Sequence, residues 1–216
     1  VARLQAPPPV PPVAGRRLLG LMRSRLVVAG LILGSIEFAS FGAFDAIWAI
    51  LLTDLGASTS FVGLSFTLIA GPLIFLATPF GRLIDRRSPL PISALGMVLL
   101  LPAVAAYGRL GAPITLALAG VVHAAASAAI GPAGAALVAR GSPPDMIARG
   151  QGLLEAVGFL AAAATALPSG WAYDTVGRGV WFGGLAGLLA VLFLVAWRLG
   201  RPSSAGDGAA LPRGSG

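Results

Sequence analysis

Four ionisable side chains stand within long apolar stretches of this 216-residue sequence: Glu37, Asp45, His123 and Glu155. Ionisable groups are costly inside a membrane, so a residue of this kind within an apolar stretch indicates a functional site. Glu37 lies eleven residues after Leu26, where its stretch begins, and a helix would place it about 16 Å deep. That depth is close to the middle of a hydrocarbon core about 30 Å thick.

The two deepest of these residues each have a functional and a structural interpretation. Desolvation disfavours the charged form of a carboxyl, so Glu37 is expected to take up and release a proton. The alternative is a neutral acid that is hydrogen-bonded to Ser40 or to a neighbouring helix. His123 lies at a matching depth, and it is either a proton carrier or a neutral imidazole bonded to Ser127.

Other charged residues are expected nearer to the helix ends. Asp45 follows Glu37 by eight residues, about 12 Å further along a helix, and is expected at a cavity mouth beside Trp48 as an interfacial anchor. Glu155 falls in the first two turns of the fifth apolar stretch, close to Arg149. A carboxylate there is stabilised by the helix dipole, which favours a structural role.

The elements that position these residues must be membrane-spanning helices. Hydrophobic residues make up 56% of the chain and charged residues 11%, which excludes a water-soluble globule, since such domains carry charge on about a quarter of their residues. Six apolar stretches are long enough to cross a bilayer, which takes about 20 residues. They run over residues 26–52, 61–80, 90–107, 114–139, 150–173 and 180–197. The predicted fold is an all-α, polytopic membrane protein.

The arginines predict how these helices are oriented. All fifteen basic residues are arginines, and thirteen lie before the first stretch, after the sixth, or in the second and fourth connections. Positively charged loops stay in the cytoplasm, so both termini are predicted to be cytoplasmic, and the predicted partner is the lipid bilayer, with no nucleic acid. The predicted domains are a Pro/Arg-rich cytoplasmic linker at 1–25, a six-helix bundle at 26–199 and a disordered cytoplasmic tail at 200–216.

Two similar segments follow the second and fifth stretches. Gly81 precedes Asp85 by four residues, and Gly170 precedes Asp174 by the same interval. Because an odd number of spans separates the two copies, they fall on opposite sides of the membrane, as an inverted-topology repeat requires. The sequence therefore predicts a 3+3 inverted repeat.

With these features, the chain resembles the carboxy-terminal six-helix half of a major facilitator superfamily transporter over nearly its whole length. The resemblance rests on the basic, Pro-rich lead-in, on LLTDLGAS after the first stretch and on PSGWAYDTVG before the last. It also rests on a loop gate motif at Gly81, Asp85 and Arg86, which departs from the family pattern at Ser88, where a second glycine is usual.

The resemblance implies twelve helices around a central cavity, which the first and fourth helices of this chain would help to line. It implies an amino-terminal six-helix half as the partner that this chain lacks. Asp85 is expected to meet a helix end of that half, and Arg149 and Glu155 are expected at the interface between the halves. The implied location is the plasma (inner) membrane of a bacterium.

The predicted function is secondary active transport. The hypothesis is a proton-coupled antiporter for efflux of small amphipathic solutes, in which protonation of Glu37 is exchanged against substrate; efflux and the solute class follow from the resemblance alone. The sequence contains no P-loop, G-x-S-x-G or H-E-x-x-H motif, so no enzyme, cofactor or metal is predicted. The alternatives are a non-transporting membrane scaffold or truncated relic, and a uniporter or importer whose Glu37 binds a polar solute.

Overall fold

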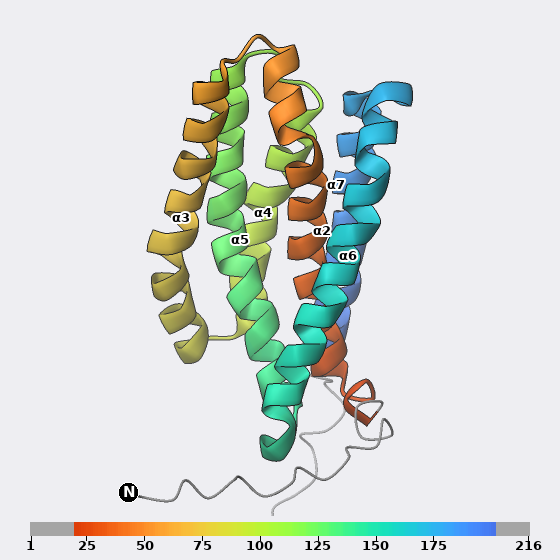
Figure 1. Cartoon of the computed structure of the whole chain (residues 1–216). Coiled ribbons are helices and arrows are strands. Elements are labelled where there is room, and N and C mark those ends of the chain that lie inside the picture. Colours follow the sequence, from red (N-terminus) through yellow and green to blue (C-terminus); the bar gives the residue numbers. More distant parts are fainter. Residues whose placement is uncertain (1–19, 202–216) are drawn as a thin grey trace, which may run out of the picture.

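The computed structural model describes residues 20–201, and this part of the chain is almost entirely helical (Figure 1). Six long α-helices follow one another, with a short 3₁₀ helix before the fifth. They are α2 (Arg25–Asp54), α3 (Thr59–Arg86), α4 (Pro89–Tyr107), α5 (Pro113–Gly141), η1 (Pro144–Met146), α6 (Ile147–Thr175) and α7 (Arg178–Gly200). Residues 1–19 of the predicted linker and 202–216 of the predicted tail lie outside the described residues.

All six predicted spans are confirmed as helices that are long and apolar enough to cross a membrane. Their surface is rich in large apolar side chains, such as Phe75, which is 77% exposed, and Leu167, which is 83% exposed. Soluble proteins rarely expose apolar patches on this scale. The bundle is therefore that of a multi-pass membrane protein, with lipid in contact with much of its surface.

The helices extend beyond the predicted apolar stretches because the signals that start and stop a helix lie outside them. The hydroxyl of Ser24 accepts a hydrogen bond from the Val27 N–H (3.4 Å) and caps α2. The hydroxyl of Ser58 does the same for α3 through the Phe61 N–H (3.2 Å). Such caps satisfy amide groups that have no partner within the helix.

The connection that was expected to hold the loop gate motif is much shorter than predicted. Since α3 continues to Arg86, the motif residues Gly81, Asp85 and Arg86 lie in the last turns of that helix and not in a loop. The helix ends just before Ser88, which is extended because a residue that precedes a proline is sterically kept out of the helical region. The sequence expectation of a loop at this place was wrong.

Two helices, α2 and α5, form the centre of the bundle (Figure 1). They contact each other; α2 also contacts α6 and α7, and α5 also contacts α3 and α4, while α4 meets α7. This set of pairings is unchanged when α2, α3 and α4 are exchanged with α5, α6 and α7. A 3+3 repeat would produce such an arrangement, and the repeat itself stays a prediction.

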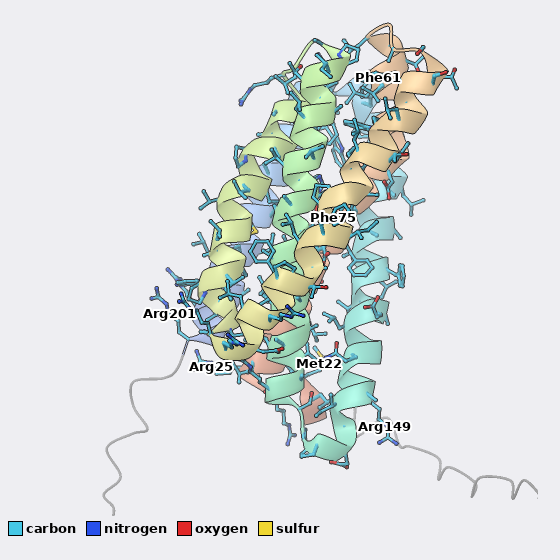
Figure 2. The ribbon with its side chains drawn as sticks, turned by 90° about the vertical axis from the view of Figure 1, so that its left-hand side faces the viewer. Met22, Arg25, Phe61, Phe75, Arg149 and Arg201 are labelled. Atoms are coloured by element: carbon cyan, nitrogen blue, oxygen red, sulfur yellow. The ribbon has the colours of Figure 1, made fainter. Side chains whose placement is uncertain are left out.

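The described chain ends lie at the same end of the bundle. Figure 2 labels Arg25, Arg149 and Arg201 near this end and Phe61 near the opposite one. An even number of spans returns the chain to the side on which it started. The side of the membrane that this arginine-bearing end faces stays a prediction.

Direct backbone contact holds the two central helices together. A Cβ atom added at Gly30 in α2 would lie 2.6 Å from the Gly134 carbonyl oxygen and 2.9 Å from the Val138 nitrogen, both in α5. Lipid tails are as apolar as leucine, so close approach through small residues replaces the hydrophobic effect as the source of helix association. Glycine at position 30 therefore permits the α2–α5 contact.

We expect Gly30→Ala to lower the stability of the purified protein by about 1–3 kcal/mol, because the added methyl group collides with backbone that cannot move aside. The measurement is thermal unfolding in detergent, in which size-exclusion chromatography reports the fraction of protein that stays folded after heating. The matched control is Gly187→Ala in α7, where an added Cβ meets nothing within 4 Å. Equal losses in the two variants would contradict this account of the α2–α5 contact.

Candidate functional site

A cavity of about 300 Å³ opens between α2 and α6, and we call it the α2–α6 cavity. Five of its lining residues come from one face of α2, since residues three and four apart lie on the same side of a helix. The other two come from α6. The lining residues are Glu37, Phe38, Phe41, Gly42, Asp45, Phe159 and Ala162.

Glu37 lies near the middle of α2 and is half-buried. Its carboxyl group rests against Gly131 of α5, where an added Cβ would come within 2.7 Å of Oε1. No side chain or backbone group in residues 20–201 donates a hydrogen bond to this carboxyl. The alternative of an acid bonded to Ser40 is wrong, because the Ser40 hydroxyl donates to the main-chain oxygen of Glu37 (2.7 Å).

Asp45 is exposed and lines the same cavity as Glu37. Eight residues of helix separate the two carboxylates, a rise of about 12 Å. Trp48 does not act as the expected interfacial anchor beside Asp45: it is 1% exposed, and its Nε1 donates to the Ser65 hydroxyl of α3 (2.9 Å). A buried indole N–H usually finds such an acceptor. Trp48 can therefore pack inside the bundle.

His123 lies outside the α2–α6 cavity and connects three helices. From α5 its Nε2 lies 3.0 Å from the Ser40 hydroxyl of α2, and its Nδ1 lies 2.9 Å from the Tyr107 hydroxyl of α4. The ring of Phe41 stacks on the imidazole at a centroid distance of 4.7 Å. The expected bond to Ser127 is wrong, since the buried Ser127 hydroxyl has no hydrogen-bond partner among the described residues.

Both ring nitrogens of His123 have a hydroxyl partner. The Ser40 hydroxyl also donates to the Glu37 carbonyl, and the tautomer that fits this bond has the imidazole Nε2–H donating to the Ser40 oxygen. In that tautomer the Tyr107 hydroxyl donates to Nδ1. The role of His123 as a proton carrier stays a prediction.

The hydrogen-bonded chain from Tyr107 through His123 and Ser40 ends at the main-chain oxygen of Glu37 and not at its carboxyl group. Glu37 and His123 are thus close in space but chemically separate. The first faces an open cavity without a hydrogen-bond donor, and the second is enclosed with both nitrogens paired. Of these two residues, only Glu37 lines the α2–α6 cavity.

The charges expected at the start of α6 occupy two different places. The Arg149 guanidinium donates to the sulfur of Met146 (3.1 Å) near the arginine-bearing end (Figure 2). Glu155 is exposed further along the same helix, and its expected place at the interface between two halves stays a prediction.

The motif at the end of α3 is held by an arginine from another helix. Asp85 and Arg86 are exposed, whereas the guanidinium of Arg140, in the last turn of α5, donates to the carbonyl oxygens of Ile84 (2.6 Å) and Arg87 (3.3 Å). The last carbonyls of a helix have no partner within it, and a basic side chain can satisfy them. Arg140 thus positions the helix end that carries the motif.

Sequence reasoning missed four residues that shape this region. Gly131 makes room for the Glu37 carboxyl, Phe159 forms the second wall of the cavity, and Tyr107 bonds to His123. Gln151 crosses from α6 to donate to the Ala135 carbonyl of α5 (2.9 Å). Tyr107 and Gln151 are polar side chains within or at the ends of apolar stretches, a signal that a search restricted to ionisable residues overlooks.

The helices and the cavity together define a multi-pass membrane protein in which two acidic side chains, Glu37 and Asp45, line a cavity between two candidate membrane-spanning helices. Among residues 20–201 there is no group of three His, Asp or Glu side chains that could hold a metal ion. The sequence profile of the Major Facilitator Superfamily matches residues 30–214. The chain therefore belongs to this family, whose members are membrane transporters. No curated protein and no solved structure matches the chain significantly.

Membership in the family agrees with the central place of the first and fourth helices, α2 and α5. The α2–α6 cavity has α6 as the wall that faces α2, and Gly131 of α5 lies against the Glu37 carboxyl. That α2 and α5 line a central cavity between two halves stays a prediction.

We expect Ser40→Ala to destabilise the protein by about 1–3 kcal/mol, because it leaves the Nε2–H of buried His123 without an acceptor. Ser127→Ala is the matched control: this serine is equally buried, but its hydroxyl has no partner to lose. Thermal unfolding in detergent measures both variants. If both changed the midpoint equally, the hydrogen-bond assignment around His123 would be wrong.

Proposed function

We propose that this chain is the carboxy-terminal half of a secondary transporter that exports small amphipathic solutes in exchange for protons. The observation that carries the proposal is the Glu37 carboxyl, which lines a cavity at the middle of a membrane-spanning helix without any donor from the described chain. A carboxyl in this setting has no structural bond to maintain. It is free to bind a proton or a solute.

The surroundings of Glu37 support proton exchange. Glu37 shares the α2–α6 cavity with Asp45, and no group of the described chain donates a hydrogen bond to its carboxyl. His123 of α5 contacts the hydroxyl of Ser40 and not this carboxyl. A carboxyl that no protein group engages is available to exchange a proton.

The proposed mechanism needs a second six-helix bundle. Transporters of this kind carry substrate by rocking two bundles around a site near the membrane midplane. Glu37 lies near the middle of α2, so in this proposal the α2–α6 cavity lies close to that midplane and the amino-terminal half completes it. In this arrangement both termini of the chain are cytoplasmic, because the arginine-bearing end stays on the cytoplasmic side under the positive-inside rule. Asp85 and Arg86 face the other half at that end.

We expect Glu37→Gln to abolish flux driven by a pH gradient, because glutamine keeps the shape of the side chain but cannot exchange a proton. The measurement is solute uptake into proteoliposomes that contain the protein expressed from its complete gene, with and without an imposed pH gradient. Asp145→Asn is the control: this acid is exposed between α5 and α6, away from the α2–α6 cavity, and its neutralisation should leave the flux unchanged.

The same experiment separates the alternatives. Undiminished pH-driven flux in Glu37→Gln would refute proton coupling through this residue. Flux that runs down the solute gradient equally well in both proteins, without any response to pH, would identify a uniporter. A protein that inserts and folds but carries no solute would support the scaffold hypothesis.

A further inference from the structure

We infer that a second cavity, at the arginine-bearing end of the bundle, binds an anionic phospholipid whose phosphate is held by Arg87 and whose acyl chain lies along α4. This cavity has a volume of about 500 Å³ and lies where α3 ends and α4 begins, and we call it the α3–α4 cavity. It shares no lining residue with the α2–α6 cavity, so the inference goes beyond the proposed function and does not depend on it. The lining residues are Leu83, Arg87, Ser88, Pro91, Ile92 and Leu95.

The polar side of the α3–α4 cavity is positively charged. Residues 82–88 include three arginines, and Asp85 is their one acidic residue. Arg87 is exposed, and its carbonyl oxygen accepts a hydrogen bond from the guanidinium of Arg140 (3.3 Å), which brings a fourth positive charge to this corner. The guanidinium of Arg87 itself has no hydrogen-bond partner in residues 20–201. A guanidinium presents a planar set of donors that matches a phosphate group.

Side chains must recognise the headgroup here, because the backbone offers few donors. The first turn of a helix usually attracts anions through its free N–H groups, but Pro89 and Pro91 at the start of α4 have no N–H. The hydroxyl of Ser88 precedes them and makes no capping hydrogen bond to α4. It is therefore free to donate to a phosphate oxygen beside Arg87.

The apolar side of the α3–α4 cavity continues along α4 toward the membrane interior. With 28 residues, α3 is about 42 Å long, which matches a bilayer of about 40–45 Å with its headgroups, so its end lies at headgroup level. Leu95 and Val98 follow Pro91 by four and seven residues and share one face of α4 with it. They are 53% and 69% exposed. An acyl chain can lie on this face while its headgroup stays at Arg87.

The proposed contact of Asp85 with an amino-terminal half leaves the α3–α4 cavity open. Leu83 and Arg87 both line the cavity and are about one turn apart, so they lie on one side of α3. Asp85 lies about half a turn from each of them, on the opposite side of the helix. The surface that would meet the other half and the surface that would meet the lipid therefore face in different directions.

The test is native mass spectrometry of the delipidated protein, expressed from its complete gene and titrated with dioleoylphosphatidylglycerol. The matched probe is dioleoylphosphatidylcholine, which has the same acyl chains and a headgroup without net charge. We expect the first anionic lipid to bind about fivefold more tightly than the zwitterionic one, and we expect Arg87→Gln to remove about that factor. Arg25→Gln is the matched control: this arginine is exposed at the same end of the bundle and does not line the cavity (Figure 2). It should leave the preference unchanged.

Equal binding of the two lipids would overturn the inference. Equal losses in Arg87→Gln and Arg25→Gln would also overturn it, since they would indicate attraction to the whole arginine-bearing end. Displacement of the anionic lipid by inorganic phosphate would overturn it as well, because an ion without an acyl chain would then be the ligand.

If Arg87→Gln fails to fold, Ser88→Asp gives the same decision. Aspartate is a favoured residue at the start of a helix, so this variant keeps α4 intact while it places a negative charge in the α3–α4 cavity. We expect it to abolish the preference for the anionic lipid, and an unchanged preference would contradict the inference.

Discussion

A polar side chain inside the hydrocarbon of a membrane must either find a partner in the protein or face a cavity, and α2 shows both outcomes within a single helical turn. Ser40 donates to the backbone and accepts from His123, so its hydroxyl is fully used. Glu37, three residues earlier, faces the α2–α6 cavity without a donor from the described chain. An unsatisfied polar group in hydrocarbon costs several kcal/mol, roughly the stability of a small domain, so Glu37 is tolerated because it faces the cavity.

The satisfied residue helps to hold the unsatisfied one in place. His123 links α5 to Tyr107 of α4 and to Ser40 of α2, and so restrains the rotation of α2 about its own axis. The Gly30 contact with α5 limits the distance between the same two helices. Together these contacts turn Glu37 toward Gly131 and the cavity. The histidine thus contributes to the site by holding α2 in place.

Glycine has two separate uses in this packing. At Gly30 its missing side chain lets the backbones of α2 and α5 meet, whereas at Gly131 it leaves a recess that the Glu37 carboxyl fills. Three glycines of α7, at positions 183, 184 and 187, meet nothing within 4 Å in the described chain. A glycine in a helix therefore does not by itself indicate a contact, because the contact requires a partner helix on the same side.

The sequence by itself determined the six spans, since a bilayer selects helices by length and apolar composition, and both are local properties of the chain. It also gave the separation of about 12 Å between Glu37 and Asp45 along one helix, because each residue adds about 1.5 Å. Only the tertiary structure decided that His123 bonds to Tyr107 and Ser40, that Trp48 faces inward and that α6 forms the second wall of the cavity. Those outcomes depend on how each helix is rotated about its axis, and that rotation is set by contacts between residues far apart in the chain.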